Sequence, residues 1–188
     1  MTFDDALAVL RGVAVVEIGC GPGPIAQAAV GIDIDLGALR GLRSGMCRIA
    51  RDAHQLPLAH GAVHAVVARG LLHHSRDLRR LLSEVRRVLA PGGVFLALDC
   101  GPLRERDFND MTRQLHARGH PGEPRNSVAP SELHRLLRHS GFTDITSYCS
   151  GTWTNATPPF SERIFRSPAW THRALAGANP PRQPRSTI

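Results

Sequence analysis

A glycine-rich stretch, VEIGCGPGPIAQAAVGIDID, carries the clearest chemical pattern in this sequence of 188 residues. Glycines stand at alternate positions, at Gly19, Gly21 and Gly23. A loop without side chains can bring its backbone N–H groups close to a ligand. The dinucleotide pattern G-x-G-x-x-G does not fit, because Pro24 stands where the third glycine belongs. Two carboxylates flank the loop, Glu17 and Asp33, and a carboxylate can accept hydrogen bonds from ligand hydroxyl groups.

Two adjacent histidines, His73 and His74, are the candidates for acid–base catalysis. A neutral imidazole is available near pH 7 and can take a proton from a hydroxyl group or an amine. A packing role for either histidine stays open. Replacement of each by alanine would separate the two roles.

The elements that must position these groups alternate between strands and helices. Strands are expected over residues 12–19, 29–34, 47–53, 62–70, 93–99 and 143–150, from their β-branched apolar runs. Helices are expected over residues 4–11, 36–45, 75–90, 104–118 and 129–141. This alternation predicts a doubly wound, Rossmann-like α/β fold with a mostly parallel sheet. Such sheets bind ligands at the carboxyl ends of their strands.

The pattern acid-x-G-x-G-x-G resembles the first motif of the class I S-adenosylmethionine-dependent methyltransferases. The likeness continues in GID at 31–33, in RDAHQLP at 51–57 and in the Pro-Gly-Gly turn at 91–93. It covers residues 13–148 and is closest to the branch that methylates quinones and other small molecules. The resemblance implies S-adenosylmethionine as cofactor and methyl transfer to a small-molecule acceptor in biosynthesis, such as a secondary metabolite.

The resemblance also implies a cofactor-binding set. Its members are Glu17, Gly19, Cys20, Gly21, Gly23, Asp33, Ile34, Asp52, Ala53, Arg69 and Gly70. In this family the first acid orders the glycine loop, which passes under the methionine moiety. Asp33 would accept both ribose hydroxyls, and Ile34 would pack on the adenine.

The remaining implied contacts are to the adenine and the methyl group. Asp52 would accept a hydrogen bond from the adenine amino group, and the Ala53 backbone would donate to the ring. Arg69 and Gly70 would border the methyl group. Each residue also has a structural alternative: Asp52, for example, could be an acid of a surface turn.

The first crossover connection is unusually short. Nine residues separate Gly23 from Asp33, and the second strand takes about four of them. The first crossover helix should therefore be shortened to about one turn at most. Without this helix, the sheet face behind it would be bare. We expect part of residues 151–172, a second copy of the chain or a partner subunit to cover that face.

The spacing of these motifs also predicts the domain organisation. Residues 1–150 should form the methyltransferase domain. Residues 151–188 should form a C-terminal extension that is partly packed and disordered at its end, since it is rich in proline and polar residues.

Composition limits the function classes. The formal net charge is +7, and all 23 basic residues are arginine. The absence of lysine excludes a Walker phosphate lysine and a Schiff-base lysine. The four cysteines are widely spaced, so no metal site is expected. The sequence shows neither a secretory signal nor an apolar run long enough for a membrane span, so a cytoplasmic location is expected.

Two other functions compete with small-molecule methylation. Net positive charge favours a nucleic-acid methyltransferase, but the arginines are spread along helices with acids between them. The chain also lacks an Asn-Pro-Pro-Tyr type motif after the fourth strand, so a nucleic-acid acceptor is disfavoured. The shortened crossover favours a non-methylating or partner-dependent member of the fold.

Overall fold

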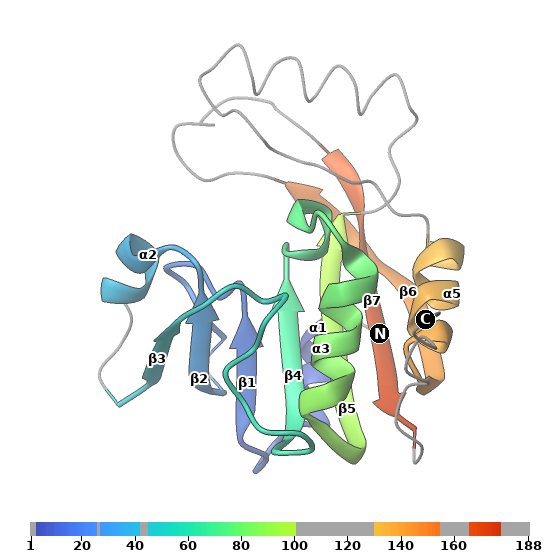
Figure 1. Ribbon diagram of the computed structural model, residues 1–188. Coiled ribbons are helices and arrows are strands. Elements are labelled where there is room, and N and C mark those ends of the chain that lie inside the picture. The colour runs from blue at the N-terminus through green and yellow to red at the C-terminus, as the bar shows by residue number, and fades with distance from the viewer. Residues whose placement is uncertain (1–2, 26, 42–44, 101–129, 155–165, 178–188) are drawn as a thin grey trace.

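Seven strands form a single sheet in the part of the chain that the computed structural model describes, residues 3–25, 27–41, 45–100, 130–154 and 166–177. Their bounds are Val15–Ile18 (β1), Ala28–Asp33 (β2), Cys47–Ala50 (β3), Val63–Arg69 (β4), Leu89–Cys100 (β5), Phe142–Thr154 (β6) and Arg166–Ala176 (β7). The strand order is β3-β2-β1-β4-β5-β7-β6 (Figure 1). β1 to β5 pair in parallel, whereas β7 is antiparallel to both β5 and β6. The expected doubly wound, mostly parallel α/β fold is confirmed.

Helices cover both faces of this sheet. The described helices are α1 (Phe3–Ala8), α2 (Leu36–Arg40), α3 (Leu78–Val88) and α5 (Pro130–His139), with a short 3-10 helix, η1 (Leu72–His74). α3 and α5 pack on one face and α1 and α2 on the other, each against its own apolar cluster. None of the helices in the described ranges is long and apolar enough to cross a membrane. The helix expected over residues 104–118 lies outside the described residues.

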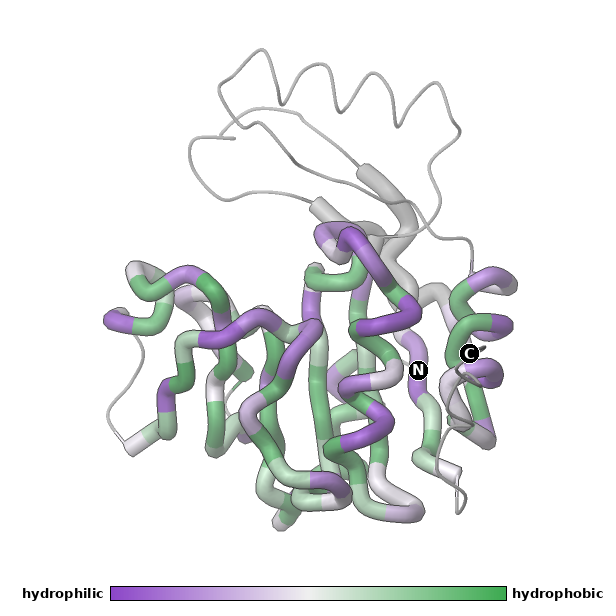
Figure 2. Tube along the Cα trace, viewed as in Figure 1, coloured by the Kyte–Doolittle hydropathy of each residue, from purple (hydrophilic) through white to green (hydrophobic). Residues whose placement is uncertain are grey.

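α3 shows how the sequence fixes this packing. Its inward positions are fully buried: Leu81, Leu82, Val85 and Val88. Asp77 caps its start by accepting a hydrogen bond from the backbone N–H of Arg80. Figure 2 shows strands that are largely hydrophobic and an α3 that alternates between hydrophobic and hydrophilic positions. This helix holds the connection after β4 against the sheet.

The Pro-Gly-Gly segment near the start of β5 needs its glycines. Gly92 has a φ of +75°, and a Cβ on Gly93 would lie 2.9 Å from the carbonyl oxygen of Ala90. Leu89 pairs with Val63, and the register between β4 and β5 then shifts before Val94 pairs with Ala65. The Pro-Gly-Gly segment therefore lies within β5, a few residues after α3 ends at Val88, where the ladder with β4 shifts register.

The first crossover contains no helix in its described residues, 19–25 and 27, as the short spacing predicted. The expectation of a bare sheet face is corrected. Val15, Ala65 and Val67 on that face are fully buried. They belong to one cluster with α1, Ile25 of the crossover and Met46. Because α1 and the inward side chain of Ile25 cover these strands, no second subunit is needed for that purpose.

The expected boundary between residues 150 and 151 lies inside β6. Residues 166–176 of the expected extension form β7, which lies between β5 and β6 (Figure 1). Part of the C-terminal segment is therefore integrated into the sheet. Residues 155–165 and 178–188 lie outside the described residues.

Candidate active site

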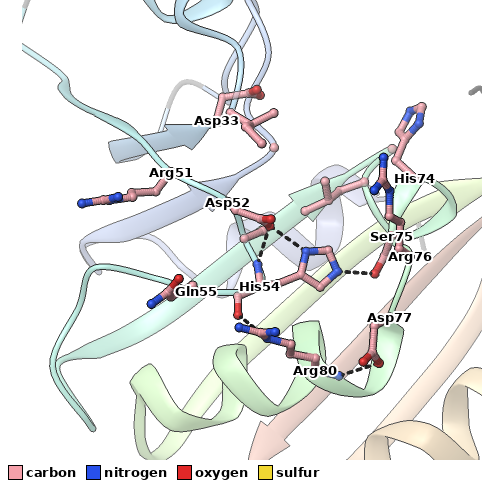
Figure 3. Close-up of a pocket in the computed structure, with 15 residues that line it drawn as sticks. Asp33, Arg51, Asp52, His54, Gln55, His74, Ser75, Arg76, Asp77 and Arg80 are labelled. Carbon is pink, nitrogen blue, oxygen red and sulfur yellow. Dashed lines mark hydrogen bonds and ion pairs between the residues drawn. The ribbon is translucent and has the colours of Figure 1, made fainter.

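A cavity of about 840 Å³ opens where β1 to β4 reach their carboxyl ends (Figure 3). Its lining residues are Gly19, Asp33, Ile34, Arg51, Asp52, Ala53, His54, Gln55, Gly70, Leu71, His74, Ser75, Arg76, Asp77 and Arg80. These residues follow four different strands, and the parallel sheet brings them to one edge. The cavity thus occupies the ligand position that the fold predicts.

The glycine loop leaves β1 through a conformation that other residues rarely adopt. Gly19 and Gly21 have φ values of +60° and +53°. A Cβ on Gly19 would lie 2.7 Å from Cδ1 of Leu71 across the cavity wall. The N–H groups of Gly19 and Cys20 both donate to the carbonyl of Ile32, at 2.8 and 3.3 Å. A larger residue at position 19 would therefore push the loop and the segment after β4 apart.

Glu17, on β1, binds this loop through hydrogen bonds. Its carboxylate is fully buried, and it accepts hydrogen bonds from the backbone N–H of Ile25 at 2.7 Å and from Arg69 Nε at 2.8 Å. Arg69 Nη2 also donates to the carbonyl of Gly23. Burial raises the pKa of Glu17, and Arg69 and the Ile25 N–H partly counter that rise. Glu17, Gly21, Gly23 and Arg69 do not line the cavity, so they act through the loop.

Asp33 joins the loop to β2. One carboxylate oxygen accepts from the N–H of Gly21 at 2.8 Å, and the other accepts from the N–H of Asp35 at 2.9 Å. The next residue, Ile34, is 74% exposed at the edge of the cavity. An exposed aliphatic side chain beside a carboxylate is suited to a ligand with both an apolar ring and hydroxyl groups.

Asp52 belongs to a hydrogen-bonded chain across the cavity wall (Figure 3). Its Oδ1 accepts from the N–H of His54 at 2.8 Å and lies 2.6 Å from His54 Nδ1. On the other side of the ring, His54 Nε2 lies 2.8 Å from Ser75 Oγ. Although burial raises the pKa of Asp52, the hydrogen bonds from His54 outweigh it and hold that pKa below its ordinary value. The chain links the loop after β3 to the loop after β4.

The two candidate histidines differ in their surroundings. His73 Nδ1 lies 2.6 Å from Oδ1 of Asp99, and the other oxygen of Asp99 accepts from the N–H of Leu72 at 2.7 Å. His74 lines the cavity, and its ring centroid lies 4.0 Å from that of His73. Asp99 is buried at the end of β5. It therefore orients the His73 ring, whereas His74 contributes to the cavity wall.

Cys20 is buried beside the loop and does not line the cavity. Burial, followed by the nearby carboxylates of Asp33 and Glu17, raises the pKa of its thiol to about 11. The thiol is therefore protonated at neutral pH, which does not favour a nucleophilic role.

Comparison with known proteins identifies the domain that carries this site. Residues 16–97, which include the glycine loop and the strands around the cavity, match the methyltransferase domain family. The chain belongs to the class I S-adenosylmethionine-dependent methyltransferases. Their methyl donor is S-adenosylmethionine.

Relatives of this methyltransferase domain are found in several bacteria. A Mycolicibacterium smegmatis protein that carries the name "Probable S-adenosylmethionine-dependent methyltransferase" is 31% identical over 144 residues, which are 68% of this chain and 51% of that protein. Malonyl-[acyl-carrier protein] O-methyltransferase 1 of Coxiella burnetii is 27% identical over 121 residues, which are 60% of this chain and 42% of that enzyme. The chain thus spans about half the length of the curated relatives it matches.

Solved structures agree on the methyltransferase fold. The structure of an S-adenosylmethionine-dependent methyltransferase from Thermotoga maritima superimposes with a TM-score of 0.71 and 18% identity, covering 93% of this chain and 86% of the other. At that identity the likeness supports the fold and leaves the acceptor open.

The donor set of the cavity fits the methyl donor of this family. Asp33 offers a carboxylate for a ribose diol, and Ile34 offers an apolar surface for an adenine. Gly19 and Gly70 leave backbone exposed at the cavity wall, each with a positive φ. Among the described residues, no group of three or more His, Cys, Asp or Glu side chains could hold a metal ion. The site is therefore suited to a nucleoside with an attached amino acid.

Sequence reasoning missed several residues of this methyltransferase site. His54, Ser75 and Asp99 make the contacts that orient Asp52 and His73. His54 had a local signal, since an aspartate often accepts from the N–H two residues later. Asp99 had no local signal in the sequence, because only the pairing of β4 with β5 brings it close to His73. Other missed cavity residues are Arg51, Gln55, Leu71, Arg76, Asp77 and Arg80.

Proposed function

We propose that this chain binds S-adenosylmethionine in the cavity and catalyses transfer of its methyl group to a small-molecule acceptor. One observation carries the proposal: Gly19, Asp33, Ile34 and Asp52 line a single cavity, although they come from the ends of three different strands. The match of residues 16–97 to the methyltransferase domain family supports the same donor. The name of the Coxiella burnetii relative, an O-methyltransferase of a malonyl thioester, supports an acceptor of the small-molecule class.

The chain's residues divide the binding task. Asp33 would accept hydrogen bonds from ribose hydroxyls while the Gly21 N–H keeps its carboxylate oriented. Ile34 would cover one face of the adenine. Asp52, held by His54, would accept from the adenine amino group. The glycine loop would approach the amino acid portion with its backbone.

The bound donor supplies an electrophilic methyl group on a sulfonium. The sulfur leaves as a neutral thioether and needs little assistance. The protein then contributes positioning of the acceptor and exclusion of water. An acceptor hydroxyl or amine must also lose a proton. We assign that proton to His73, because the carboxylate of Asp99 stabilises an imidazolium and directs the basic nitrogen to Nε2. His74 forms the adjacent wall of the cavity.

Calorimetric titration of the purified chain with S-adenosylmethionine and S-adenosylhomocysteine tests donor binding. We expect one site for each compound. A panel of small hydroxyl, amine and malonyl-thioester acceptors, with S-adenosylhomocysteine release as the readout, then tests transfer. A chain that binds neither compound would contradict the proposed function.

The assignment of the base needs an active acceptor. His73→Ala should lower kcat and remove the acidic limb of the pH profile, on which protonation of the base limits turnover, while His74→Ala should act mainly on KM of the acceptor. Asp99→Asn should shift the acidic limb of the profile to lower pH, because the imidazolium loses the carboxylate that stabilises it. Unchanged turnover in His73→Ala would exclude this histidine from the mechanism.

A further inference from the structure

The crossover from β1 to β2 is held by side chains instead of by a helix. Its described residues, 19–25 and 27, form no helix, yet Ile25 is buried and the loop has defined hydrogen bonds at several positions. We propose that Arg69 is a positioning residue for the methyl donor, because its guanidinium ties this crossover loop to β1 and β4. This role deepens the proposed function and rests on it for the identity of the ligand.

The contacts of Arg69 span the loop. Nε donates to Glu17 on β1 at 2.8 Å, and Nη2 donates to the carbonyl of Gly23 at the far side of the glycine pattern. The other oxygen of Glu17 accepts from the N–H of Ile25 at 2.7 Å. One arginine and one glutamate therefore fix two points of the loop, and both side chains come from strands of the central sheet.

The charge balance makes this pair interdependent. Glu17 is fully buried, whereas the Arg69 side chain is 30% exposed. A buried carboxylate is costly unless a cation and hydrogen-bond donors compensate it. Loss of Arg69 alone would leave the Glu17 charge without its cation. Loss of both charges would remove that penalty while the Gly23 carbonyl still lacks its donor.

The position of the loop matters for the ligand because the loop has one residue at the cavity and a second that orients a cavity-lining carboxylate. Gly19 lines the cavity, and the N–H of Gly21 orients Asp33 at 2.8 Å. Gly23 and Ile25 directly follow these residues in the chain. Release of Gly23 would therefore change the position of Gly21 and, through it, the orientation of the Asp33 carboxylate.

Arginine is specifically suited to this position. Its planar guanidinium donates in two directions at fixed angles, so that it can reach a carboxylate and a carbonyl together. A lysine at position 69 would keep the charge beside Glu17, but its single ammonium group could not donate to the carboxylate and the carbonyl at the same fixed angles. Arg69→Lys should therefore restore stability more fully than it restores donor affinity.

The test compares Arg69→Met, Arg69→Lys and the double variant Glu17→Gln/Arg69→Met with the wild-type chain. Thermal unfolding gives stability, and calorimetric titration with S-adenosylhomocysteine gives affinity. Arg86→Met is the control: Arg86, like Arg69, donates hydrogen bonds to two separate acceptors, here the carbonyls of Gly141 and Gly177, but it is buried and lies outside the loop.

We expect Arg69→Met to lower both Tm and affinity, with affinity weaker by roughly tenfold or more, as the loss of a charged hydrogen bond implies. The double variant should regain Tm relative to Arg69→Met while its affinity stays low. Arg86→Met should lower Tm and keep the affinity. Wild-type affinity in the double variant would overturn the positioning role. A wild-type chain that binds neither S-adenosylmethionine nor S-adenosylhomocysteine would instead overturn the proposed function, and this inference with it.

Discussion

Two aspartates at the end of β2 perform different tasks although they are two positions apart. Asp33 lines the cavity, whereas Asp35 caps α2 by accepting from the N–H of Gly37 at 2.7 Å. Asp33→Asn should weaken S-adenosylhomocysteine binding by about ten- to a hundredfold, because hydrogen bonds to a charged acceptor contribute about 1.5–3 kcal/mol. Calorimetry measures this change.

Asp35→Asn is the control for that experiment. It should leave the affinity close to the wild-type value, since asparagine also caps helices well. Equal losses of affinity in the two variants would show that the loop conformation, and not the Asp33 carboxylate itself, determines binding.

The pKa of Glu17 predicts that the stability of the Arg69 variant depends on pH. Burial raises it, and the cation of Arg69 opposes the rise. An acid whose pKa is higher in the folded state contributes most stability below its unfolded pKa and loses that contribution as the pH rises through the folded value. Removal of Arg69 should raise the folded pKa further. The Tm deficit of Arg69→Met should therefore be larger at pH 8 than at pH 5.

Thermal unfolding of the wild type and Arg69→Met across this pH range measures the difference. In Glu17→Gln/Arg69→Met the pH-dependent part of the deficit should disappear, because no ionisable group remains at position 17. A deficit of Arg69→Met that is equal at both pH values would contradict the coupling.

Among the elements, β7 has the largest influence on the sheet. It pairs with β5 from Val94↔Leu175 to Cys100↔Ala169, and with β6 along most of its length. A chain that ends at Ser150 lacks β7, so both neighbours lose a ladder of hydrogen bonds and the buried Phe95 loses part of its cover. We expect this chain to lose its cooperative thermal transition.

A chain that ends at Gly177 provides the comparison, because it keeps all described strands. It should unfold within a few degrees of the full chain. A cooperative transition at the wild-type Tm in the chain that ends at Ser150 would show that β7 is dispensable.

His172 on β7 makes the sheet sensitive to acid. Its ring is buried, with Nδ1 2.9 Å from Ser147 Oγ, and burial lowers its pKa to about 4 despite the opposing charge of Asp99. A histidine with a depressed pKa destabilises the fold as the pH falls from its unfolded pKa, about 6.5, toward the folded value. The loss should approach about 3 kcal/mol near pH 4, at about 1.4 kcal/mol per unit.

Unfolding curves of the wild type and His172→Gln between pH 7 and pH 4 test this expectation. The variant removes the titrating ring, so its stability should fall less steeply. Parallel curves for the two proteins would exclude His172 as the source of acid sensitivity.

At the scale of the whole molecule, ligand binding and global stability should be linked. The cavity is built from four strands of one sheet, so a ligand bound there stabilises the folded state against unfolding. At a concentration a hundred times its Kd, S-adenosylhomocysteine should add about 2.7 kcal/mol. For a chain of this size, Tm should rise by roughly 5–10 °C. Differential scanning calorimetry measures the shift, with adenosine alone as the control.

The sequence predicted the parts of the fold that local patterns encode. The β-branched runs identified β1 and β4, and the periodicity of residues 75–90 identified α3, although the helix ends at Val88 and the Pro-Gly-Gly segment lies inside β5. Glycine spacing located the loop at the cavity. The pairings between distant segments were not predictable in the same way. Residues 166–176 have proline and arginine among their apolar positions, so their place inside the sheet depends on β5 and β6.

The residues that cover the sheet beside the first crossover were also not predictable from local patterns. Counting residues predicted a first crossover helix of about one turn at most, and the described residues 19–25 and 27 form none, but the count did not predict what replaces the helix. The Ile25 side chain enters the core, and its N–H donates to Glu17. That outcome depends on the position of Arg69 in space, which no local pattern of residues 19–27 contains.

The position of β7 has a consequence for synthesis on the ribosome. β5 and β6 are made earlier, but they are not neighbours in the sheet, and the strand that joins them follows both in the chain. Until β7 leaves the exit tunnel, β6 has no ladder partner among the strands that the structure describes, and the edge of β5 that β7 covers is unpaired. The nascent chain therefore exposes two unpaired strand edges, which makes that interval the most aggregation-prone stage of its synthesis. Slow translation of the segment between β6 and β7 would prolong this stage, and a chaperone that shields strand edges would act there.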